Sequence, residues 1–134
     1  QNPQPRTYNL QHSPDIAQTI TVTCFGLGVA CQLTGLHTLK IKETDRLQAL
    51  KNELEKLGAL VTISNNSLSM QPSSGITENV TIKTYQDHRM AMAFAPLALK
   101  MGLIIEDAEV VSKSYPDFWN NLESLGFTME QLSV

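Results

Sequence analysis

The sequence predicts an α/β domain, because apolar helix patterns alternate with short β-rich runs along its 134 residues. One sequence pattern occurs four times: a polar cluster with an aspartate, then a helix with periodic apolar residues, usually a glycine, and a β-rich run. The chain is 42% hydrophobic with a formal net charge of -3, so we expect a single domain over residues 1–134. We expect it to be cytoplasmic, because it has neither a long basic stretch for nucleic acid nor an apolar run of membrane-spanning length.

The first part of the chain, about residues 6–71, predicts the order β-α-β-α-β-β. A strand over residues 7–11 precedes a helix pattern that runs from Ile16 to Leu33, and a β-rich run, TGLHTLKI, follows. Cys24 and Cys31 fall within this one predicted helix, about 10 Å apart along its axis. That separation excludes a disulfide between them, and we expect two small core residues.

The second helix has the clearest pattern. Its apolar positions recur at three- and four-residue steps, at Leu47, Leu50, Leu54 and Leu57. Asp45 and Gln48 resemble a capping box, and Gly58 predicts a left-handed end. The runs LVTIS and SLSMQ then flank an Asn-Asn pair, which predicts a hairpin.

The second part, about residues 79–131, repeats the pattern incompletely. NVTIKT predicts a strand, and HRMAMAFAPLALKM predicts a buried helix that Pro96 kinks or ends early. GLIIED predicts a strand, FWNNLESL a helix, and GFTMEQ a short final strand. Because no closing hairpin follows, and because the chain opens on Gln1, we expect a piece of a longer protein.

Positive side chains stand where helices begin, although the helix macrodipole disfavours them there by about 0.3 to 1 kcal/mol. Lys42 and Arg46 bracket the start of the second helix, His88 and Arg89 open the third, and Lys113 precedes the fourth. Helix starts in α/β layers gather at one edge of the sheet, so these cations predict a site for phosphate or carboxylate.

Other interpretations of these residues remain open. Each cation has a carboxylate close in sequence, so the charges could be ordinary exposed ion pairs. His88 taken alone is more often a structural histidine, and Asp15 could be a helix cap after Ser13-Pro14. No cysteines or histidines have metal-ligand spacing, so we predict no metal.

Three segments, LKIKETDRLQALKNELEKLGA, YQDHRMAMAFAPLALK and SKSYPDFW, resemble the C-terminal motifs of the EPSP synthases (3-phosphoshikimate 1-carboxyvinyltransferases) in order and spacing. SPDIAQTI matches a further segment of that family. The resemblance implies the enolpyruvyltransferase fold, in which repeated β-α-β-α-β-β units form inside-out α/β barrels. One complete and one incomplete unit would be present here, and the active site would lie between two domains, most of which belong to the remainder of the enzyme chain.

The family reaction moves the enolpyruvyl group of phosphoenolpyruvate to the 5-hydroxyl of shikimate 3-phosphate without a cofactor. By matching position, the resemblance implies that Asp15 takes the hydroxyl proton and that Glu43 is the second acid/base residue. Shikimate 3-phosphate would contact Asp15, Lys42 and Thr38, the last of which replaces an asparagine of some members. Phosphoenolpyruvate would be held by Arg46, Arg89, Lys113 and His88.

Three alternatives to this function stay open from the sequence. The first is the related enolpyruvyltransferase that acts on UDP-N-acetylglucosamine. The second is a non-catalytic module that binds a phosphorylated metabolite, and the third is a packing domain with surface ion pairs only. Under the leading interpretation the 134-residue chain is inactive alone, because half of the cleft is missing.

Overall fold

The computed structural model describes residues 6–71 and 75–132. The first part contains β1 (Thr7–Asn9), α1 (Ala17–Leu27), β2 (Cys31–Thr34), α2 (Arg46–Leu57), β3 (Leu60–Ile63) and β4 (Leu68–Gln71). The second contains β5 (Thr81–Ile82), α3 (His88–Phe94), β6 (Ile104–Ile105) and α4 (Phe118–Ser124). The predicted α/β class is confirmed, and the first part has the predicted order of strands and helices. The division into two units of about 6–71 and 79–131 stays a prediction.

Four strands form one sheet in the order β1-β2-β4-β3. β1 pairs with β2 in parallel, whereas β4 pairs with both β2 and β3 in antiparallel fashion. The register places Cys31 opposite Met70 and Leu33 opposite Leu68, so apolar side chains collect on one face. The other face is mainly polar, with Thr7, Gln32, Thr62 and Ser69 around a shallow hollow.

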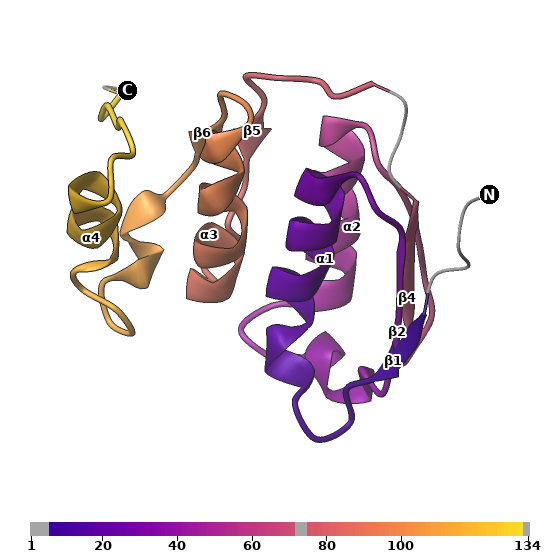
Figure 1. The fold of residues 1–134 in the computed structure, drawn as a ribbon. Coiled ribbons are helices and arrows are strands. Elements are labelled where there is room, and N and C mark those ends of the chain that lie inside the picture. Colours follow the sequence, from indigo (N-terminus) through magenta and orange to yellow (C-terminus); the bar gives the residue numbers. More distant parts are fainter. Residues whose placement is uncertain (1–5, 72–74, 133–134) are drawn as a thin grey trace.

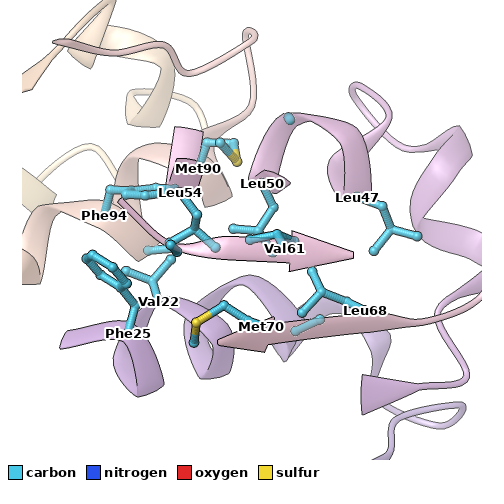
Figure 2. Close-up of a cluster of buried hydrophobic side chains, with 14 of the residues drawn as sticks. Val22, Phe25, Leu47, Leu50, Leu54, Val61, Leu68, Met70, Met90 and Phe94 are labelled. Carbon is cyan, nitrogen blue, oxygen red and sulfur yellow. The ribbon is translucent and has the colours of Figure 1, made fainter. Parts of the chain in front are cut away.

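Helices α1 and α2 cover the apolar face of this sheet, and α3 lies beyond them (Figure 1). Figure 2 shows the resulting core, in which side chains from the sheet, from α1 and α2, and from α3 meet. Phe25 of α1 and Phe94 of α3 are both buried, so α1 is enclosed between the sheet side and α3. The layers therefore hold α1, α2 and α3 in fixed relative positions, which matters for the site described below.

The third helix ends early, as predicted. α3 stops at Phe94, and the chain continues as a 3-10 helix over Ala95–Leu99 that contains Pro96. Proline has no backbone N–H and cannot continue the α-helical ladder. A second small core, made by Ala91, Ala95, Val111 and Phe118, joins α3 to the α4 region.

The second helix and the hairpin also agree with the predictions. α2 spans Arg46–Leu57, the Asp45 side chain accepts a hydrogen bond from the Gln48 backbone N–H at 3.1 Å, and Gly58 is left-handed at φ 111°. The reciprocal bond, from the Asp45 backbone N–H to the Gln48 side-chain oxygen, is not found among the described residues, and the Gln48 Nε2 donates to Asn52 Oδ1. β3 and β4 form the hairpin around the Asn-Asn pair.

The prediction for the first helix was wrong at its C-terminal end. α1 stops at Leu27, because Gly28 adopts a left-handed conformation at φ 74° and the Val29 N–H bonds the Cys24 carbonyl at 2.9 Å. Cys31–Thr34 is the strand β2, and TGLHTLKI contains a 3-10 helix over His37–Ile41 in place of the predicted strand. The apolar pattern continues past Gly28 because β2 is also buried, so periodicity alone did not reveal the boundary.

The predicted separation of the two cysteines was therefore wrong as well. Cys24 lies in α1 and Cys31 in β2, close enough for Cys24 to contribute to the raised pKa of Cys31. Both are free thiols, the first partly buried and the second buried.

The predicted final strand does not form either. Gly126 is left-handed at φ 105°, and residues 127–132 have no strand partner within the described part of the chain. None of the helices in residues 6–71 and 75–132 combines the length and the apolar character that a bilayer crossing requires.

Candidate functional site

Three helices begin at the same edge of the molecule. α1, α2 and α3 all start at the lower edge of Figure 1, where the chain enters each helix from a strand or a loop. Arg46 is the first residue of α2, and His88 and Arg89 are the first two of α3. Asp15 lies in the 3-10 turn over Pro14–Ile16 that leads into α1. The topology thus brings together residues that are far apart in the sequence.

Arg46 is the centre of this edge. Its side chain is 2% exposed and bonds three carboxylates. Nε donates to Asp87 Oδ2 at 2.7 Å and Nη2 to Asp87 Oδ1 at 3.1 Å. Nη1 donates to Asp15 Oδ1 at 3.0 Å, and Nη2 also pairs with Glu43 Oε2. A buried guanidinium with three acidic partners is not a surface ion pair, so that interpretation is wrong for Arg46.

Asp15 links two further cations to Arg46. Lys42 Nζ lies 3.5 Å from Asp15 Oδ1, and Arg89 Nη1 donates to the Asp15 backbone carbonyl at 3.3 Å. Asp15 is not a helix cap: Ser13 and Ile16 occupy the two cap positions, and neither helix start has a side-chain cap bond. Its side chain is 41% exposed, so the carboxylate is accessible while it contacts both Lys42 and Arg46.

Asp87 is a site residue that sequence reasoning missed. It is fully buried, bonds Arg46 twice, and caps α3 by accepting the Arg89 backbone N–H at 3.0 Å. In the sequence it was only the carboxylate next to His88 and Arg89, a candidate for an ordinary ion pair. The bond to Arg46 joins residues 41 apart in the chain, so no local sequence pattern predicted it.

The loop before Asp87 has an unusual backbone. Tyr85 and Gln86 are both left-handed, at φ 56° and 57°. The loop is held by Tyr85, whose hydroxyl donates to buried Glu53 at 2.5 Å, and by Thr84, whose hydroxyl donates to the Glu106 carbonyl. Burial and the bond to Glu53 raise the pKa of Tyr85, so it stays a neutral donor. Strained backbone of this kind is often found where a side chain must be placed for function.

Two buried polar atoms near these helix starts have no hydrogen-bond partner among the described residues. They are Gln18 Oε1 in α1 and the Thr38 hydroxyl in the 3-10 helix before Lys42. The other end of the Gln18 amide points to Asp87, with Nε2 3.4 Å from Oδ2. Unpaired buried polar groups are costly and call for a functional or structural reason.

The remaining predicted residues lie at the margin. His88 Nδ1 is 4.0 Å from Asp87 Oδ1, and the ring is partly exposed. Lys113 makes no ion pair in the described ranges, and the segment that leads into α4 lies farther to the left in Figure 1. Lys42, Arg46 and Arg89 therefore come together around Asp15, whereas Lys113 makes no ion pair with this group among the described residues. In residues 6–71 and 75–132 no group of three His, Cys, Asp or Glu side chains has an arrangement for a metal ion.

The geometry at this edge, where α1, α2 and α3 begin, defines a class of site. Such a site can bind a small anion beside two accessible carboxylates. Arginine and lysine neutralise phosphate or carboxylate groups, and exposed Asp and Glu side chains can move protons. The family model described as EPSP synthase (3-phosphoshikimate 1-carboxyvinyltransferase) matches residues 2–122. The chain belongs to the EPSP synthase family.

Sequence relatives have the same description. A 3-phosphoshikimate 1-carboxyvinyltransferase from Bacteroides fragilis is 50% identical over 117 residues, which cover 85% of this chain and 28% of the relative. One from Neisseria meningitidis is 36% identical over 120 residues, which cover 89% and 28%. These relatives do not support the alternative of a UDP-N-acetylglucosamine enzyme.

A solved structure has the same fold. EPSP synthase from Acinetobacter baumannii matches with a TM-score of 0.77 and 25% identity over 88% of this chain and 28% of that chain. The enolpyruvyltransferase fold class is therefore confirmed. The chain spans 28% of the length of the B. fragilis relative as well, so the activity of the whole protein is a matter for proposal.

Proposed function

We propose that the full-length protein transfers the enolpyruvyl group of phosphoenolpyruvate to the 5-hydroxyl of shikimate 3-phosphate. The observation that carries this proposal is the convergence of Lys42, Arg46 and Arg89 on Asp15, because each has a nitrogen within 3.5 Å of an Asp15 oxygen. Both substrates are polyanions, and a cluster of three cations is suited to bind them. The partners are these two metabolites and the remainder of the enzyme chain, and the compartment is the cytoplasm.

Phosphoenolpyruvate would bind to Arg46 and Arg89. In this structure, Asp15 and Glu43 occupy the outer N–H groups of Arg46. An incoming carboxylate or phosphate would replace them and satisfy the same donors. Substrate binding would thereby release two carboxylates for proton transfer, Asp15 to accept the hydroxyl proton and Glu43 to exchange a proton with the methylene carbon. Lys113 and His88 would complete the phosphoenolpyruvate site once the other domain is in place.

Shikimate 3-phosphate would lie beside Lys42 and Thr38. Lys42 is exposed and can reach a phosphate or hydroxyl, and the Thr38 hydroxyl has no partner among the described residues. Because this hydroxyl is buried, the Thr38 side chain would have to change rotamer before a ligand hydroxyl or phosphate oxygen could satisfy it. Asp15 stands between this position and Arg46, as required of a base that serves the hydroxyl nucleophile.

The test is Arg89→Ala in the full-length protein. We expect KM for phosphoenolpyruvate to rise by about tenfold or more, because a charged contact to the substrate is lost. Lys51→Ala is the matched control, since Lys51 pairs with Glu55 on the outer side of α2. An unaltered KM in the Arg89 variant would rule out the proposed phosphoenolpyruvate site.

A further inference from the structure

We propose that Asp87, supported by Gln18, is a positioning residue that holds the Arg46 guanidinium so that its substrate edge faces Asp15, Glu43 and the bound anion. This inference rests on the proposed function, because it gives Arg46 an anion to bind. Neither Asp87 nor Gln18 is among the residues that the sequence motifs assign to a substrate.

The two edges of the guanidinium have different partners. The side edge, formed by Nε and Nη2, is bound by both oxygens of Asp87, at 2.7 and 3.1 Å. The end edge, formed by Nη1 and Nη2, faces Asp15 and Glu43. A planar fork that is fixed along one edge has its other edge oriented as well. Asp87 therefore determines where the end edge points.

Burial separates the permanent partner from the exchangeable ones. The Asp87 side chain has no exposed surface, whereas those of Asp15 and Glu43 are 41% and 45% exposed. A substrate anion can reach and replace the two exposed carboxylates, but it has no path to Asp87. The Asp87 contact is thus the one that persists when the site is filled.

Gln18 supports Asp87 from α1. It is 1% exposed, and its Nε2 lies 3.4 Å from the same Asp87 oxygen that accepts the Arg46 Nε–H. The amide limits rotation of the carboxylate away from Arg46. Its Oε1 has no partner in the described ranges, so burial of the Gln18 side chain costs free energy. A role in holding the carboxylate accounts for that cost.

Asp87 also connects the two arginines. Oδ1 accepts from Arg46 Nη2 and from the Arg89 backbone N–H. One carboxylate consequently sets the orientation of the first residue of α2 and the start of α3. A shift of Asp87 would move both cations that are proposed to hold phosphoenolpyruvate.

The experiment is a double-mutant cycle in the full-length protein, with phosphoenolpyruvate affinity taken from KM, or from calorimetry where turnover is too slow. Asp87→Asn keeps an oxygen that can cap α3 but loses the charge and one acceptor. We expect it to weaken affinity by about tenfold or more in the wild-type background. In the Arg46→Lys background, Asp87→Asn should weaken the affinity by less than about a further twofold, because lysine has no guanidinium edge for Asp87 to hold.

Glu53→Gln is the matched control. Glu53 is an equally buried carboxylate of α2 with its own partners, Lys56, Tyr85 and the Lys83 backbone N–H. Its loss should lower thermal stability, and, because Glu53 also bonds Tyr85 of the loop before Asp87, any change in affinity should be equal in the wild-type and Arg46→Lys backgrounds. If Asp87→Asn behaves like Glu53→Gln, or weakens affinity equally in both backgrounds, the positioning role is overturned.

Gln18→Met, which keeps the side-chain volume, decides the matter if Asp87→Asn does not fold. We expect an affinity loss of about threefold that disappears in the Arg46→Lys background, and an unchanged affinity overturns the support role. The proposed function fails separately: Arg46→Lys alone with unchanged affinity shows that Arg46 does not hold phosphoenolpyruvate. An effect of Arg46→Lys with no dependence on Asp87 overturns only the positioning role.

Discussion

Gln86 shows at the scale of one residue how the site is supported. It is exposed, makes no side-chain hydrogen bond among the described residues, and has a left-handed backbone at φ 57° next to another left-handed residue, Tyr85. The resemblance to the EPSP synthases implies that asparagine is common at this position, before Asp-His-Arg, and the residue types alone suggest no consequence of the replacement by glutamine. The left-handed backbone gives the replacement a consequence, because asparagine tolerates the left-handed region better than glutamine.

We predict that Gln86→Asn raises the free energy of unfolding of the full-length protein by about 0.5 to 1 kcal/mol. Denaturant or thermal unfolding measures the change. Gln48→Asn on the exposed side of α2 is the control with the opposite expected sign, because asparagine is a poorer helix former. A lower stability for Gln86→Asn would show that the turn is not strained at this residue.

Cys31 provides a second prediction at the residue scale. Burial, followed by the neighbouring Cys24, raises the pKa of the Cys31 thiol from 9.0 to about 12. Since only the thiolate is alkylated, Cys31 should be nearly unreactive toward iodoacetamide at about pH 8 in the folded protein and reactive in urea. Mass spectrometry of timed samples measures both rates. Equal rates for Cys31 in the two states would contradict this.

At the scale of elements, the link between β1 and the Asp15 turn depends on Gly35. This glycine follows β2, has φ 76°, and lies against the turn in which the Gln11 N–H bonds Asn9 Oδ1. A Cβ there would overlap Asn9 Oδ1 and lie 2.5 Å from the Gln11 backbone nitrogen. The close approach requires glycine, because a backbone atom cannot move aside without displacing the chain that carries Asp15.

We predict that Gly35→Ala costs about 2 to 4 kcal/mol of stability in the full-length protein. Gly28→Ala separates the strain of the left-handed backbone from the steric overlap of the Cβ. Gly28 is also left-handed, at φ 74°, but has open space around its missing Cβ. It should cost only about 1 to 2 kcal/mol. Similar losses for the two variants would mean that the contact with the Asn9 turn contributes nothing.

At the scale of the whole molecule, the described chain leaves apolar surface uncovered beside α1. Val22, Gly26 and Leu27 of α1 face Leu97 and Leu99 across a groove of about 380 Å³. Leu27 and Leu99 are 66% and 77% exposed. Large exposed side chains around a groove are typical of a surface that another segment covers. This agrees with a chain that spans 28% of the B. fragilis relative.

We predict that the isolated 134-residue chain does not consume shikimate 3-phosphate and phosphoenolpyruvate, because only part of the proposed cleft is present. Calorimetry should show negligible phosphoenolpyruvate binding to this chain and clear binding to the full-length protein. Tight binding to the isolated chain would favour a free-standing binding module instead.

The sequence by itself determined the elements whose signals are local. The boundaries of α2 followed from leucine periodicity, the Asp45 cap and Gly58, and the early end of α3 followed from Pro96. The same local reasoning placed cations at the helix starts. It misplaced the end of α1, because a buried helix and a buried strand have the same apolar composition.

Only the tertiary structure decided which charges meet. The bonds from Arg46 to Asp15 and Asp87 span 31 and 41 residues, and they depend on how α1, α2 and α3 pack over the sheet. The same packing makes Asp87 a buried partner and leaves Asp15 accessible. Periodicity and capping report the conformation of neighbouring residues, whereas solvent exclusion and ion pairing depend on distances that the chain reaches only after it folds.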